Sequence, residues 1–80
     1  MFRHVEGRIR GNQTGAFDFD VDNLNALEMV FRHRLVMLLR KIAIEEGLKI
    51  TFTDYAGEHY HLQWEPSEVP SMEFRWPISP

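Results

Sequence analysis

Cysteine is absent from the 80-residue chain, which excludes disulfide scaffolds, thiolate zinc sites and thiol nucleophiles. Long apolar runs are absent as well: the longest, residues 35–39, spans five residues and is far too short to cross a membrane. The N-terminal segment MFRHVE lacks the apolar stretch of a signal peptide. We therefore expect a soluble, cytoplasmic protein.

Recognisable catalytic patterns are also scarce. Serine occurs only at Ser67, Ser71 and Ser79, in a proline-rich tail where neither a base nor an oxyanion hole can be held rigidly. No glycine-rich loop follows a strand pattern and opens a helix, as phosphate binding of that kind would require. We expect neither enzymatic activity nor a cofactor.

Apolar residues make up 44% of the chain and aromatic residues 12%, which is enough for one globular core. The net charge of −3 is unevenly distributed. Residues 1–44 contain seven basic and five acidic side chains, a net charge of +2, whereas residues 45–80 contain two basic and seven acidic ones, a net charge of −5. Such polarity can steer association with a partner.

Alternating apolar and polar positions predict two β-hairpins, one on either side of a helix. Residues 3–10 and 17–21 alternate around a glycine-flanked polar loop, and residues 48–53 and 59–64 alternate around a second turn. Between the two hairpins, residues 24–46 contain neither glycine nor proline. The predicted fold class is α+β with the order ββαββ, a small antiparallel sheet with one long helix packed on one face.

The C-terminal segment differs in composition from the rest. We expect residues 1–64 to form a single α+β domain and residues 65–80 to form an extended arm. Prolines at positions 66, 70, 77 and 80 exclude a helix there and disfavour a central strand. Within the arm, residues 72–76 alternate, which is typical of a short edge strand or of an extended segment.

The predicted helix ends at Gly47, a residue suited to a left-handed C-cap, and is apolar on more than one side. Its core stripe consists of Leu24, Leu27, Phe31, Leu35, Leu38 and Ile42. A second apolar row, about 130° around the helix, consists of Ala26, Val30, Met37 and Ile44. A single sheet of short strands cannot cover both sides, so either the arm folds back with Met72, Phe74 and Trp76, or another chain covers the row.

These features favour a small, free-standing protein-interaction module that docks on a larger macromolecular complex, with a protein partner or a second copy of the chain. Its size and lack of motifs are typical of inhibitors, regulators or adaptors of the kind that phages and mobile elements encode. The candidate partner-binding residues are Val30, His33, Met37, Arg40, Ile44, Met72, Phe74 and Trp76. Glu45 and Glu46 crowd the helix C-terminus against the macrodipole, so either Lys41 and Lys49 or a basic patch of a partner is expected to compensate.

Two alternatives remain open. One is a homodimeric nucleic-acid-binding regulator using Arg8, Arg10, Arg32 and Arg40, although a sequence pI near 5.7 is low for such a protein. The other is a small hydrolase or metalloprotein built on His4, His59 and His61. The histidine pattern is incomplete as a ligand set, so we expect no metal.

Overall fold

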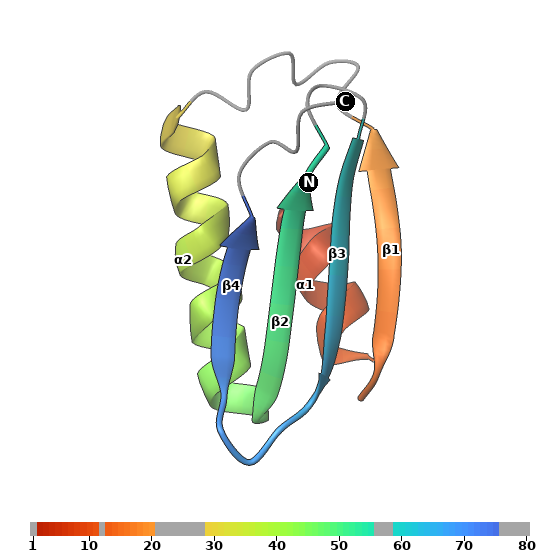
Figure 1. Ribbon diagram of the computed structural model, residues 1–80, viewed down its shortest axis with the longest axis vertical. Coiled ribbons are helices and arrows are strands. Elements are labelled where there is room, and N and C mark those ends of the chain that lie inside the picture. Colours follow the sequence, from red (N-terminus) through yellow and green to blue (C-terminus); the bar gives the residue numbers. More distant parts are fainter. Residues whose placement is uncertain (1, 12, 21–28, 56–58, 76–80) are drawn as a thin grey trace.

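The computed structural model describes residues 2–11, 13–20, 29–55 and 59–75. It is a small α+β fold in which two helices lie on one face of a four-stranded mixed sheet (Figure 1). The strands are ordered β1-β3-β2-β4 across the sheet. The elements are α1 (Phe2–Arg10), β1 (Gly15–Asp20), α2 (Met29–Glu46), β2 (Leu48–Asp54), β3 (His59–Pro66) and β4 (Ser71–Arg75).

The prediction of a strand over residues 3–10 is wrong, because this segment forms helix α1. Val5 and Ile9 are both buried, and they lie one helical turn apart. A spacing of four residues fits one face of a strand as well as one face of a helix, so the alternation alone did not distinguish them. A salt bridge of 3.0 Å between Glu6 and Arg10, also four residues apart, spans one turn of the helix.

Helix α2 confirms the predicted long helix over residues 29–46, while residues 24–28 lie outside the described part of the chain. It ends as expected at Gly47, which adopts a left-handed φ of 67°. Among the described side chains of α2, Leu35, Leu39, Ile42 and Ala43 are completely buried.

The predicted core stripe of α2 is therefore correct only in part. Leu35 and Ile42 belong to the buried face, whereas Leu38 is half-buried and Leu39 takes a central position in its place. The side chain of Phe31 is not among those described.

Strands β2 and β3 form the predicted second hairpin, with Phe52 opposite Leu62 and Ile50 opposite Trp64. The remaining pairings differ from the prediction of a sheet made of two sequential hairpins. Strand β1 pairs antiparallel with β3, placing Phe17 opposite Leu62. All these side chains face the helices, and they form one core with α1 and α2.

Of the two options for residues 72–76, an edge strand or an extended segment, the edge strand is observed over residues 71–75 as β4. It runs parallel to β2, so the sheet is mixed and not antiparallel as predicted. Met72 lies opposite Ile50 and Phe74 opposite Phe52, with the two phenylalanine ring centroids 5.3 Å apart in an edge-to-face arrangement. Met72 and Phe74 thus pack against the core between the sheet and α2, and they do not cover the second apolar row of the helix. Trp76 lies outside the described residues.

Candidate protein-binding surface

The side of α2 that points away from the sheet carries a mixed apolar and basic surface. We call this surface the outer face of α2; its described members, all exposed, are His33, Arg34, Met37, Arg40, Lys41 and Ile44. At 100° per residue, Met37 lies opposite the centre of the buried face. Met37 is 49% exposed and Ile44 is 67% exposed.

Cationic side chains flank the two apolar ones. By helical geometry, His33 and Arg40 lie on one side of Met37, and Arg34 and Lys41 lie on the other. The Arg40 guanidinium also approaches Met37 directly, with Nη1 3.8 Å from the sulfur atom. Methionine and arginine are both enriched in the centres of protein interfaces, because each combines a long, adaptable side chain with a large contact area.

The structure brings together half of the predicted partner-binding residues. His33, Met37, Arg40 and Ile44 share the outer face of α2. Met72 and Phe74 do not contribute to it, because they pack against the core from β4. The side chains of Val30 and Trp76 are not among those described.

The acidic C-terminus of α2 is compensated by Arg10 of α1 in addition to Lys41, which lies 3.8 Å from Glu45. Arg10 donates hydrogen bonds to Glu45 at 2.7 Å and Glu46 at 2.8 Å, and to Glu6 within its own helix. These contacts join the C-terminal ends of the two helices. The hydrogen bond from Arg10 lowers the pKa of Glu45, and the bonds to Glu45, Glu46 and Glu6 raise the pKa of Arg10. An external basic patch is therefore not needed to explain these glutamates.

Arg32, although it belongs to α2, points toward the sheet. Its guanidinium lies 3.5 Å from the carboxylate of Asp54, whose side chain is only 5% exposed. Burial and the charge of Asp54 raise the pKa of the Tyr60 hydroxyl, while a hydrogen bond from Arg32 opposes the shift. A buried carboxylate next to a buried hydroxyl needs such a cation, so Arg32 has a structural function here.

The four arginines of the nucleic-acid alternative thus lie in different surroundings. Arg10 and Arg32 are bound to carboxylates, and the guanidinium of Arg8 lies 5.1 Å from the centre of the Phe17 ring. Arg40 belongs to the outer face of α2. The geometry does not gather them into one stripe that could follow a phosphate backbone.

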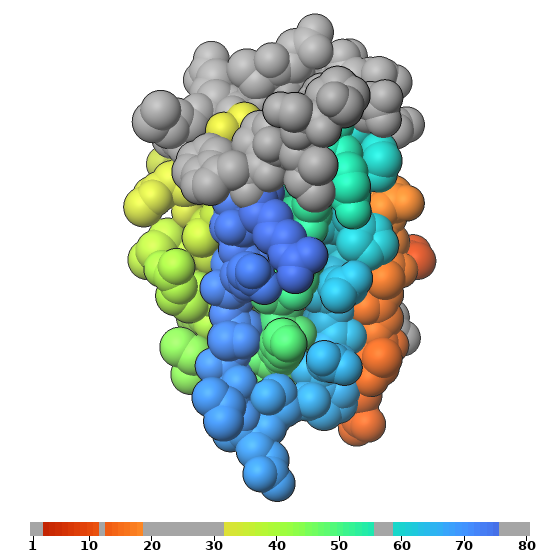
Figure 2. Space-filling view, viewed as in Figure 1, coloured from red at the N-terminus to blue at the C-terminus, as the bar shows by residue number. Residues whose placement is uncertain are grey.

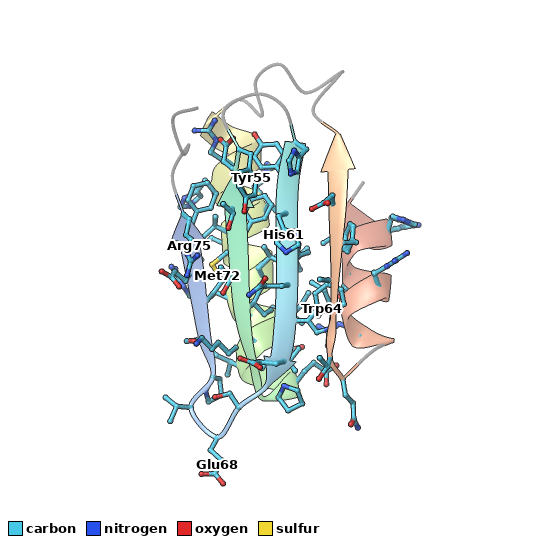
Figure 3. The ribbon with its side chains drawn as sticks, turned by 45° about the vertical axis from the view of Figure 1, so that its right-hand side comes forward. Tyr55, His61, Trp64, Glu68, Met72 and Arg75 are labelled. Atoms are coloured by element: carbon cyan, nitrogen blue, oxygen red, sulfur yellow. The ribbon has the colours of Figure 1, made fainter. Side chains whose placement is uncertain are left out.

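The sheet face opposite the helices is polar, and Figure 2 looks onto it. At its centre each ring nitrogen of His61 lies within hydrogen-bond distance of an oxygen acceptor, Nδ1 2.5 Å from Oδ1 of Asp18 and Nε2 3.1 Å from Oε1 of Gln63. The label in Figure 3 locates His61 on this side of β3. A shallow depression of about 500 Å³ lies on the same face, between Lys49, Thr51, Gln63, Glu65 and Arg75 among others.

The histidines of the metal alternative are not brought together. His59 and His61 belong to β3, where the ring of His59 stacks on Tyr55 with centroids 4.7 Å apart. His4 belongs to α1, on the other side of the sheet (Figure 1). Among the described residues, no group of three histidine, aspartate or glutamate side chains has a geometry that could hold a metal ion.

Comparison with protein-family models, with curated proteins and with solved structures finds no match for this chain. Within the described residues, neither helix combines the length and the hydropathy needed to cross a bilayer. The outer face of α2, with two large apolar side chains exposed among cations, departs clearly from the surface of an ordinary solvated helix.

Proposed function

We propose that the protein is a small interaction module that docks on another protein through the outer face of α2. The observation that carries the proposal is the exposure of Met37 and Ile44 on the side of α2 opposite its buried face. The described core is complete without them, because the sheet, including β4, fills the other side of the helix. Large apolar side chains gathered on one exposed face are typical of a surface that a partner covers.

The energetic consequence of docking is substantial for so small a surface. Full burial of an aliphatic side chain is worth about 1.5–3 kcal/mol, and a few such residues dominate the affinity of a typical interface. Met37 and Ile44 are therefore expected to be the main contributors, with the surrounding cations selecting the partner. An inhibitor, regulator or adaptor that acts by occupying a site on a larger complex would need no further chemistry.

The nucleic-acid alternative has less support. Two of its four arginines, Arg10 and Arg32, are already bound to carboxylates, and the chain has a net charge of −3. Phosphate contacts would also leave Met37 and Ile44 without an apolar surface to pack on.

Two matched substitutions test the proposal. Ile44→Glu places a carboxylate on the outer face of α2, and Val69→Glu makes nearly the same change at a 76% exposed position between β3 and β4. Each variant and the parent would be used to capture proteins from the source cell after crosslinking, with thermal melts showing that both variants fold. We expect Ile44→Glu to lose a specific partner that Val69→Glu retains. Capture of the same proteins by both variants would contradict the proposal.

A further inference from the structure

We infer that the partner presents an acidic amphipathic helix to the outer face of α2. This inference rests on the proposed function and adds the chemical class and the shape of the partner segment. It depends on the charges around Met37 and Ile44, and on the spacing of these two residues along the helix.

The outer face of α2 is cationic in a protein that is acidic as a whole. Arg34, Arg40 and Lys41 are exposed there, next to His33, while the net charge of the chain is −3. Among the described residues, the nearest carboxylates along the helix are Glu45 and Glu46, and both are held by Arg10. Lys41 lies only 3.8 Å from Glu45, but that glutamate is shared with Arg10. Complementary charge on the partner therefore means carboxylates.

The spacing of the apolar residues fits a helix as the partner segment. Met37 and Ile44 are seven residues apart, two turns of α2, and so form a short straight row along its surface. A second helix with its own apolar residues at heptad spacing can pack along such a row, while residues beside its apolar positions reach the flanking cations.

A second copy of the chain fits this surface poorly. An antiparallel two-fold arrangement that packs Met37 of one α2 on Ile44 of the other places residues near 40 and 41 close to the symmetry axis. Arg40 and Lys41 of both copies would then meet there, so that four positive charges would be crowded in one place. Like charges across an interface oppose association.

The test uses two synthetic helical peptides of about three heptads, each with leucines on one narrow face and confirmed to be monomeric. In the acidic peptide the flanking positions are glutamate, and in the control peptide the same positions are lysine. Each is titrated into isotope-labelled protein, and amide shifts and dissociation constants are measured at low and at physiological salt. We expect the acidic peptide to bind at least about tenfold more tightly, with amide shifts on α2 and weaker binding at higher salt.

A charge-reversal variant and a matched control complete the experiment. The Arg40→Glu, Lys41→Glu variant should lose the preference for the acidic peptide, whereas Val69→Glu should keep it. If both peptides bind the outer face equally well, the charge inference fails while the proposed docking surface stands. If neither peptide shifts the α2 amides, or if a DNA duplex shifts them more strongly than the acidic peptide, the inference is overturned.

Discussion

The orientation of α2 underlies both proposals, and replacing neighbouring side chains along the helix tests it. Leu39 is completely buried, Leu38 is half-buried and Met37 is 49% exposed. Leu39→Ala should destabilise the protein by about 2–5 kcal/mol, because it removes apolar contact and leaves a cavity. Leu38→Ala should cost about 1 kcal/mol, since only part of its side chain is removed from water, and Met37→Ala about 0.5 kcal/mol or less.

Urea denaturation followed by circular dichroism measures these differences as shifts of the midpoint at constant slope. At about 0.05–0.15 kcal/mol per residue, a domain of this length has a total stability of roughly 4–12 kcal/mol, so Leu39→Ala should remove a large part of it and lower the midpoint strongly. If Leu38→Ala lowers the free energy of unfolding more than Leu39→Ala does, the core stripe predicted from the sequence, with Leu38 at its centre, would be the correct one. A loss for Met37→Ala as large as that for Leu39→Ala would mean that the outer face is packed, and both proposals would fail.

Two further predictions concern the close packing at two glycines and the ion pair that joins α1 to α2. Gly15→Ala should destabilise the protein by about 1–3 kcal/mol, because the added methyl carbon would lie 2.6 Å from the Trp64 ring. At Gly7 an added methyl carbon meets nothing within 4 Å, so Gly7→Ala should stabilise α1 by about 0.5–1 kcal/mol. Thermal melts of the two variants and the parent measure both changes. Arg10→Gln should make the free energy of unfolding depend less steeply on pH in the acidic range. The pKa of Glu45 is lowered in the folded state by Arg10, so the stability that this glutamate contributes is present above its unfolded pKa and is lost as the pH falls through its folded pKa. Denaturation at a series of acidic pH values measures this change, and an unaltered profile would show that Glu45 does not depend on Arg10.

The parts of the fold that were predictable are those in which a local pattern has one interpretation. Strands β2 and β3 alternate over six or more residues and are joined by a turn, so their pairing follows from the chain itself. The end of α2 at Gly47 was predictable because left-handed backbone strongly favours glycine. The segment over residues 3–10 was too short to separate a period of 2 from a period of 3.6.

The pairings that were missed depend on contacts between distant parts of the chain. Strand β1 was expected to pair with residues 3–10. It lies instead beside β3, where Asp18 contacts His61. Similarly, nothing local indicates that β4 runs parallel to β2. The polar centre of the sheet face was therefore not identified from the sequence.

The candidate surface was easier to find than the fold that displays it, because helical periodicity alone separates Met37 and Ile44 from the core stripe. Sequence periodicity could not show which arginines remain available. Arg10 is engaged by α1–α2 contacts and Arg32 by the Asp54 carboxylate, and both depend on tertiary structure.

Because Arg10 and Arg32 are paired with carboxylates, the remaining charges of the molecule are separated more clearly. The cations left exposed on α2 are concentrated on its outer face, whereas Glu65 and Glu68 are exposed at the end of β3 and on the β3–β4 connection. A partner carrying carboxylates would thus be attracted toward the outer face and repelled from the β3–β4 end of the molecule. Such steering acts on the association rate and weakens as salt shortens the range of the field, so the salt dependence of binding should appear mainly in the on-rate. The dissociation rate should instead respond to Met37 and Ile44, since apolar contacts at the centre of an interface are insensitive to screening.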